Sequence, residues 1–314
     1  MLIQHLNAVV ISQAVFNRYT DGLISWEQFN ALNSFNIRVL EAVGIIAFPL
    51  FCFLLVEGFC HSKKRGKYLG SLLLFAVISE LPFDLAFYHV SSHKNGTFPF
   101  FIDHQNVFFT LFLGLFCLLV LDYISHWDWL SYTGSTTVSK TKKAVCNLAL
   151  IVSLTAVAIN VNSSFGYQGI KLLLGVGVLL LVCLITLCIM GTVTRKPEKT
   201  NALNRWKSFF LQSGMILGFS ILAELTAADY GGRGIILIVG LFLLRKNRWM
   251  QMLFCLCIYF TLYGSFVSKP FVIIALVLLL LYNGKRGNIK AKYAFYWFYP
   301  VHLMLLYGLA LWLE

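Results

Sequence analysis

Carboxylate, imidazole and amide side chains lie at or inside the ends of two neighbouring apolar segments. The first segment carries Glu80 and Asp84 in the run SELPFDLAFY, and the second begins with His104, Gln105 and Asn106 in HQNVFFTLFLGL. Glu80 and Asp84 are four residues apart, which places both on one face of a helix. Ionisable groups in a membrane segment are costly and indicate a functional site. The alternative is a pair of structural carboxylates bonded to neighbouring helices.

Two histidines lie inside apolar segments at opposite ends of the chain. His5 belongs to MLIQHLNAVVISQAVFNRY and His302 to KYAFYWFYPVHLMLLYGL. An imidazole can carry a proton near neutral pH, although a lone histidine is often a hydrogen-bonded core residue. The first segment is barely long enough to span a membrane, and no basic flank precedes it. It is therefore either a polar helix lining a site or the later part of a longer first span.

Further polar groups are expected at the outer ends of the segments. Arg38 opens the second apolar segment, where it can snorkel to the interface or hold a carboxylate such as Asp84. Asp229 and Tyr230 precede a glycine-rich stretch at 231–234. Glycines allow close backbone approach to a ligand such as a phosphate, but such a stretch is more often a simple turn.

The composition excludes a soluble fold. Hydrophobic residues make up 59% of the 314 positions and charged residues only 12%, whereas soluble domains carry about 25% charge. The net charge of +12 comes from short basic clusters between apolar segments, as the positive-inside rule predicts, so nucleic-acid binding is not expected. The eight cysteines form no zinc-binding pattern, and we expect no metal.

The apolar runs predict an all-α membrane bundle of about 10–11 transmembrane helices, forming a single domain over residues 1–314. Most Lys and Arg residues fall in alternate connections, at 63–67, 140–143, 195–207, 245–248 and 285–292. We therefore expect these connections and the N-terminus to be cytoplasmic. Glu57, six residues before Lys63, is expected to pair with the lysines that follow it. The apolar segments are predicted to start near Met1, Phe35, Tyr68, Asn106, Ala144, Gly169, Ser208, Gly234, Trp249, Pro270 and Tyr293.

Five runs together resemble the TraX family, in order and spacing, over essentially the whole chain. They are FPLFCFLLVEGFCHSKKRGKYL, SELPFDLAFY, HQNVFFTLFLGL, ADYGGRGIILI and FYPVHL. The resemblance implies a polytopic acetyltransferase of the bacterial inner membrane, similar to the wider transmembrane acyltransferase superfamily. Acetyl-CoA would be the acyl donor, and a peptide, glycan or lipid would be the acceptor.

The resemblance also implies a role for His5. The superfamily's essential histidine lies in a first-span motif of the form hydrophobic-Asp-His, which MLIQHL matches with His5. Gln4 stands where the family usually has Asp, so the neighbouring residue offers a neutral hydrogen bond instead of a charge. We expect His5 to be the general base or the nucleophile, with His302 as the second choice for the base.

The remaining polar groups are given supporting roles. Gln105 and Asn106 could donate to the thioester oxygen or position the acceptor, and Glu80 and Asp84 could orient His5 or bind an acceptor amine. The residues expected to hold the phosphates of CoA are Lys63, Lys64, Arg65 and Lys67.

Two other classes of function fit parts of this pattern. Carboxylates at mid-membrane depth also suit a proton-coupled transporter or flippase. A non-catalytic subunit or pseudoenzyme of the same fold is the third possibility. Hydrolysis or transfer of labelled acetyl-CoA would distinguish the enzyme from both.

Overall fold

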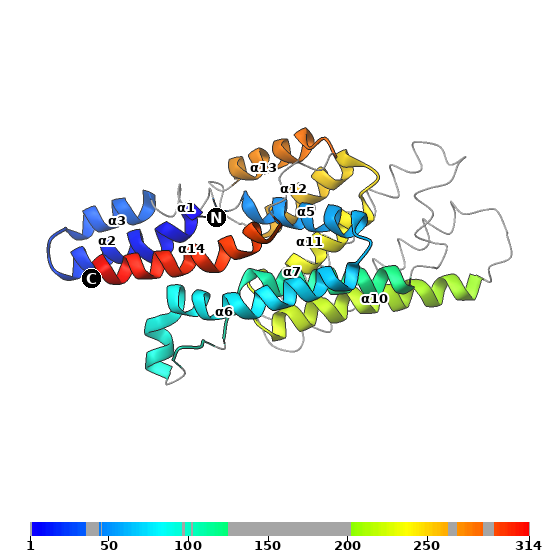
Figure 1. The fold of residues 1–314 in the computed structure, drawn as a ribbon. Coiled ribbons are helices and arrows are strands. Elements are labelled where there is room, and N and C mark those ends of the chain that lie inside the picture. Colours follow the sequence, from blue (N-terminus) through cyan, green and yellow to red (C-terminus); the bar gives the residue numbers. More distant parts are fainter. Residues whose placement is uncertain are drawn as a thin grey trace, which may run out of the picture. The chain divides into compact units, whose positions relative to one another are not determined.

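The computed structural model describes residues 2–35, 44, 46–95, 98–101, 103–124, 202–262, 269–284 and 292–313, and these ranges contain helices and no strand. The predicted all-α fold is confirmed. The elements in Figure 1 are α1 (Leu2–Leu6), η1 (Asn7–Ile11), α2 (Ser12–Thr20), α3 (Trp26–Phe35), α5 (Ala47–His61), α6 (Arg65–Asn95), α7 (Val107–Ile124), α10 (Ala202–Leu225), α11 (Gly231–Leu243), α12 (Arg248–Leu262), α13 (Lys269–Leu281) and α14 (Lys292–Leu313).

The described helices have the character of membrane helices. Two stretches, Arg65–Tyr88 in α6 and Tyr293–Leu313 in α14, are long and apolar enough to cross a bilayer. Shorter apolar helices occur at Ala47–His61, Val107–Asp122, Gln212–Leu225, Gly231–Leu243 and Phe271–Leu281. The number of spans and their orientation stay predictions, and the segments expected from Ala144 and Gly169 lie outside the described residues.

The chain divides into two compact units. The first comprises Met1–Phe51, Gly70–Phe109 and Ser265–Glu314, and the second comprises Cys52–Leu69 and Thr110–Gly264. The boundaries fall inside α5, α6 and α7, so these three helices each contribute residues to both units.

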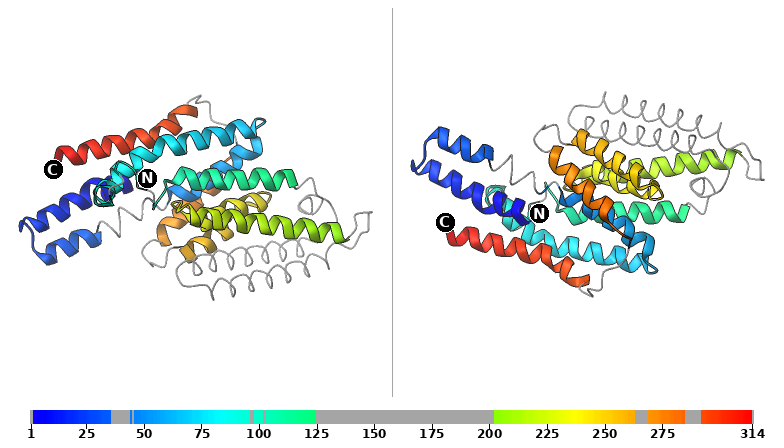
Figure 2. Two further views of the ribbon diagram at one scale, coloured as in Figure 1. Left: turned by 90° about the horizontal axis from the view of Figure 1, so that it is seen from below. Right: turned by 90° about the horizontal axis from the view of Figure 1, so that it is seen from above.

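In the first unit, α14 packs against α1 and η1 (Figures 1 and 2). The helix formed by α1, η1 and α2 contains one π-helical stretch, a feature often found at functional sites.

A short helix, α3, follows α2 in the connection that leads to the second apolar segment. Helix α3 packs back on α2. Ser25 and Gln28 cap its start reciprocally: Ser25 N donates to Gln28 Oε1 at 2.9 Å, and Gln28 N donates to Ser25 Oγ at 3.2 Å. This local capping pattern stabilises a helix that is too short to span a bilayer.

In the second unit, α11 packs against α10 and α12. Every residue of α11 except Arg233 is buried, as expected of a helix that is apolar on all sides. The helix has small residues where neighbours come close. A Cβ atom at Gly240 would overlap the ring of Phe254, and one at Gly114 in α7 would overlap Ile238.

Candidate active site

A buried pair of histidines joins α1 to α14 in the first unit. Nδ1 of His5 lies 2.8 Å from Nε2 of His302. The ring planes are parallel to within 6° and the centroids are 5.0 Å apart. Because the two nitrogens are much closer than the centroids, the rings meet edge to edge, as an N–H···N hydrogen bond requires. The side chains are 8% and 5% exposed, respectively. The structure therefore brings together the two histidines considered as alternative bases.

The hydrogen bonds of His302 determine where the protons lie. Its Nδ1 is 2.7 Å from the carbonyl oxygen of Phe298, one turn earlier in α14. A carbonyl oxygen can only accept, so Nδ1 of His302 carries a proton and Nε2 of the neutral ring has the lone pair. That lone pair accepts a hydrogen bond from Nδ1–H of His5. In the neutral pair, Nε2 of His5 is consequently the unprotonated nitrogen, which a base or nucleophile requires.

Aromatic side chains surround the histidine pair. The His5 ring meets Phe87 of α6 edge to face, with centroids 5.3 Å apart and planes at 81°, and it meets Tyr299 at 5.9 Å and 73°. The His302 ring lies nearly parallel to Phe298, with centroids 4.7 Å apart. Within the described part of the chain, no carboxylate bonds to either imidazole. Since a buried charge without a partner is costly, these surroundings favour the neutral pair.

The residues beside His5 do not orient its ring. The side chain of Gln4 packs against Gly44, where a Cβ atom would overlap it. Asn7, two residues further on, begins η1 and is fully buried, and among the described residues neither polar atom of its amide has a hydrogen-bond partner. His302 therefore supplies the orienting hydrogen bond that the sequence assigned to Gln4, Glu80 or Asp84.

Glu80 and Asn106 form a second polar cluster in the same unit. The backbone N of Asn106 donates to Glu80 Oε2 at 3.3 Å, and its side-chain Nδ2 donates to the same oxygen and to the carbonyl of Ala76 at 2.8 Å. Asn106 Oδ1 accepts from the backbone N of Phe108 at 3.0 Å, which caps the start of α7. The structure thus brings these two predicted site residues together and gives Asn106 a structural task.

Asp84 lies one turn along α6 from Glu80 and is 1% exposed. Its Oδ2 accepts a hydrogen bond from the backbone N of Phe101 at 2.9 Å. The other oxygen, Oδ1, has no partner among the described residues, and the same holds for Glu80 Oε1. His104 lies close enough to both carboxyl groups to interact with their charge. Gln105, in the same connection, is half-buried.

The glycine-rich stretch at 231–234 belongs to the second unit, where it begins α11 and is bonded by residues of the same chain. The carboxylate of Glu224 accepts a hydrogen bond from Gly232 N at 2.8 Å, at the start of α11. Tyr230 N donates to Thr110 Oγ1 at 3.3 Å, and the side chain of Asp229 is exposed. The glycines at 231–234 therefore form the first turn of α11, where the Glu224 carboxylate binds a backbone N–H that a phosphate could otherwise have used. Arg38 lies outside the described residues.

The predicted CoA-binding residues lie in the connection between α5 and α6. Lys63, Lys64 and Lys67 are exposed. Arg65 forms an ion pair with Asp122 of α7, and its Nε also donates to the carbonyl of Phe59 at 3.4 Å. Arg65 is therefore tied to the protein itself, which leaves Lys63 and Lys64 as the better candidates for anion binding.

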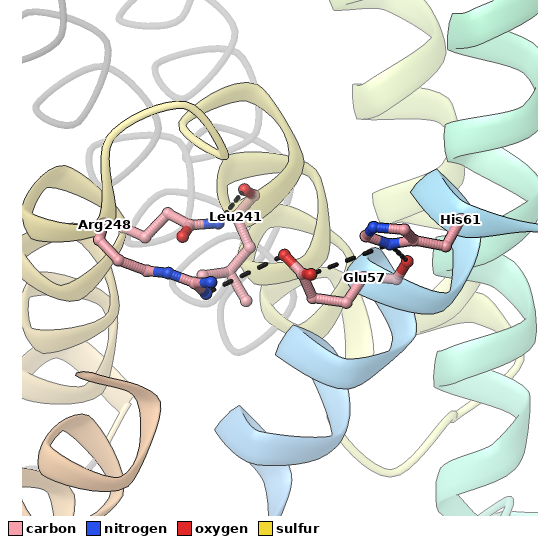
Figure 3. Close-up of polar contacts among 5 residues, drawn as sticks. Glu57, His61, Leu241 and Arg248 are labelled. Carbon is pink, nitrogen blue, oxygen red and sulfur yellow. Dashed lines mark hydrogen bonds and ion pairs between the residues drawn. The ribbon is translucent and has the colours of Figure 1, made fainter. Parts of the chain in front are cut away.

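The ion pairs that the structure shows for Glu57 are with His61 and Arg248, and not with the lysines that follow it. Figure 3 shows its carboxylate between Arg248 of α12 and His61, each with a nitrogen 4.0 Å from a carboxylate oxygen. The Arg248 guanidinium also lies over the ring of Phe53, 4.7 Å from the centroid. The expected pairing was wrong because a helix distant in sequence brings an arginine to Glu57.

The fold and site define an all-helical protein with membrane-type helices and a buried, hydrogen-bonded histidine pair. The model of the TraX protein family matches residues 1–183 and 175–310. The chain belongs to the TraX family.

A relative is known for part of this length. The probable fimbrial assembly protein FimC of serogroup H1, from Dichelobacter nodosus, is 41% identical over 87 residues. The match includes 28% of this chain and covers 35% of that relative's length. No solved structure matches the chain.

Proposed function

We propose that this protein is an acyltransferase that moves an acetyl group from acetyl-CoA to an amine or hydroxyl acceptor at the membrane. The observation that carries the proposal is the hydrogen bond between His5 and His302, which leaves Nε2 of His5 with a lone pair in a water-poor aromatic setting. Membership of the TraX family supports the proposal, because the resemblance to this family implies acetyl transfer.

In this mechanism His5 acts as the general base. Nε2 takes a proton from the acceptor as its nitrogen or oxygen attacks the thioester carbonyl carbon. The tetrahedral oxyanion collapses, the carbon–sulfur bond breaks, and the CoA thiolate takes the proton from Nε2. His302 stabilises the transient imidazolium through the hydrogen bond from His5 Nδ1–H. The alternative is that Nε2 attacks the thioester itself and forms an acyl-imidazole, which the acceptor then cleaves.

The partners follow from charge and from the relative's name. We place the phosphates of CoA at Lys63 and Lys64, on a cytoplasmic face of a bacterial inner membrane, with the N-terminus inside. Because the relative is named for fimbrial assembly, we propose a pilin-like peptide as the first acceptor to test, and a glycan or lipid next. Glu80 and Asp84 are proposed to bind an acceptor amine.

The decisive experiment uses purified protein in nanodiscs with acetyl-labelled acetyl-CoA. We expect slow hydrolysis without acceptor and labelled product with a peptide amine. His5→Gln should lower turnover by about 100- to 10,000-fold without weakening CoA binding. If the label enters the protein before product forms, and does so only with His5 present, the nucleophilic route is supported. If the wild-type protein neither binds nor consumes acetyl-CoA, the proposal fails.

One buried oxygen of Glu80 and one of Asp84 have no hydrogen-bond partner among the described residues, and this favours a second candidate, a proton-coupled transporter. Proteoliposomes with an imposed pH gradient would test this candidate. Proton flux that disappears in Glu80→Gln, from a protein inert toward acetyl-CoA, would establish transport instead of transfer.

A further inference from the structure

We propose that His302 is a positioning residue that sets the tautomer of His5, and is not itself a base. It accepts a hydrogen bond from Nδ1–H of His5 and so leaves Nε2 of His5 to react. The catalytic consequence rests on the proposed function, but the tautomer is a property of the folded protein and can be measured without any substrate.

The argument starts at the Phe298 carbonyl. This oxygen can only accept, so its 2.7 Å contact fixes the proton of His302 on Nδ1. The 2.8 Å contact with His5 then fixes the remaining lone pair of His302 as an acceptor. A chain of two hydrogen bonds, starting from a backbone group that cannot change its protonation, therefore determines the protonation of His5.

The same chain rules out His302 as the base in this state. One of its nitrogens carries a proton bonded to Phe298, and the lone pair of the other is engaged by His5. Only His5 keeps a nitrogen outside these two hydrogen bonds. The nitrogen that carries the proton in a histidine ring is set by the hydrogen bond made at the other nitrogen, and here that partner is an imidazole.

A neutral imidazole suits this position better than a carboxylate. In the aromatic surroundings of Phe87 and Tyr299, a buried carboxylate facing a neutral His5 would be an uncompensated charge. An imidazole can accept the hydrogen bond without introducing that charge. It stabilises the imidazolium formed during transfer less strongly than a carboxylate would, but it fixes the tautomer equally well.

The first test is the nitrogen NMR spectrum of protein labelled with ¹⁵N-histidine, recorded in nanodiscs at mildly alkaline pH. The His5 and His302 signals are assigned by their loss in His5→Gln and His302→Gln. We expect His5 to be protonated at Nδ1 and not at Nε2, the reverse of the usual preference of histidine in water. In His302→Phe, which keeps a ring but has no acceptor, we expect His5 to return to the Nε2–H form.

The second test is rescue by a conservative variant. In His302→Gln the amide oxygen can take the place of Nε2 and accept from His5, so turnover should stay within about tenfold of wild type. In His302→Phe, turnover should fall by about 100-fold or more, as expected of a base held in the wrong tautomer, at unchanged CoA affinity.

His61 provides the matched control. Its Nδ1 makes the same kind of bond, at 2.8 Å to the carbonyl of Glu57 one turn earlier, but its ring is exposed and, in the part of the chain that the structure describes, bonds to no second histidine. His61→Phe should therefore change neither the spectrum of His5 nor turnover.

The results separate the two proposals. His5 protonated at Nε2 in the wild-type protein, or unchanged at Nδ1 in His302→Phe, would overturn the positioning role. If His302→Phe fails to fold, loss of activity in a folded His302→Gln whose His5 keeps the Nδ1–H form would overturn it too. The expected spectra from a protein that never transfers acetyl groups would reject the proposed function while supporting the tautomer assignment.

Discussion

Asn106 donates hydrogen bonds to the Glu80 carboxylate from both its backbone and its side-chain nitrogen, across 26 residues of sequence. The same side chain also bonds to the carbonyl of Ala76 and caps α7 through its oxygen. One amide thus ties the middle of α6 to the start of α7. These contacts predict that Asn106 matters first for stability.

We expect Asn106→Ala to lower the free energy of unfolding by about 2 kcal/mol or more. The change removes an N-cap, typically worth about 1 kcal/mol, and leaves Oε2 of Glu80 with only the 3.3 Å hydrogen bond from the backbone N of residue 106. Thermal unfolding in detergent measures the effect. Asn30→Ala on the exposed side of α3 is the control and should be nearly neutral. Unchanged stability with reduced acetyl transfer would instead assign Asn106 to substrate binding, as the sequence predicted.

Two substitutions at Asp84 separate its hydrogen bond from its charge. Asp84→Asn keeps an oxygen that can accept from Phe101 N, so stability should remain within about 1 kcal/mol of wild type. Asp84→Ala removes that acceptor and should cost about 1–3 kcal/mol. Since no described contact joins Asp84 to His5, we expect Asp84→Asn to raise KM for an amine acceptor and to change kcat by less than about tenfold. A 100-fold or greater fall in kcat would mean that the carboxylate orients the base after all.

The helices were predictable from the sequence wherever a long run of apolar residues determines where a helix lies. Segments expected from Asn106, Trp249 and Tyr293 correspond to α7, α12 and α14, which begin within one residue of those positions. Helix α3 was not predicted because its ten residues are too few and too polar to form a span, although its capping pair, Ser25 and Gln28, is present in the sequence. A search for long apolar runs cannot predict a helix of this kind, because two local hydrogen bonds stabilise its start.

The sequence offered candidate residues for the site, but not the contacts between them. His5 and His302 were both identified as candidates, and the structure joins them across 297 residues. No local periodicity encodes such a pair, because it depends on how α1 packs against α14. The same holds for Glu57, whose expected partners were its neighbours in sequence but whose arginine partner is Arg248 of α12.

Charge reversal at Lys64 tests the proposed donor site. Lys64→Glu should weaken CoA binding severalfold, because it places a like charge beside the phosphates. The effect should shrink as salt is added, since an exposed charge is screened within about 10 Å at 0.1 M ionic strength. Calorimetric titration with CoA measures both. Arg18→Glu makes the same change of charge on α2 and should leave the affinity unaltered. If both variants weaken CoA binding equally, the effect comes from the net charge of the protein, and Lys64 is not part of the CoA site.

Two glycine substitutions test the packing of the second unit. Gly240→Ala puts a methyl group into the ring of Phe254 and should destabilise the protein by about 1–3 kcal/mol. Gly214→Ala in α10 meets nothing within 4 Å and should stabilise by about 0.5–1 kcal/mol through helix propensity. Opposite shifts in unfolding temperature are expected. Shifts of the same sign would show that α11 has room to move away from α12.

Helix α11 has 13 residues and is therefore about 20 Å long, well short of the roughly 30 Å hydrocarbon thickness of a bilayer. A helix facing lipid at that length would force thinning or tilt. Because nearly all residues of α11 are buried in protein, its length does not have to match the thickness of the bilayer. Bilayers of different thickness should therefore act on α14, whose outer face is exposed from Phe295 to Trp312, and leave α11 undisturbed.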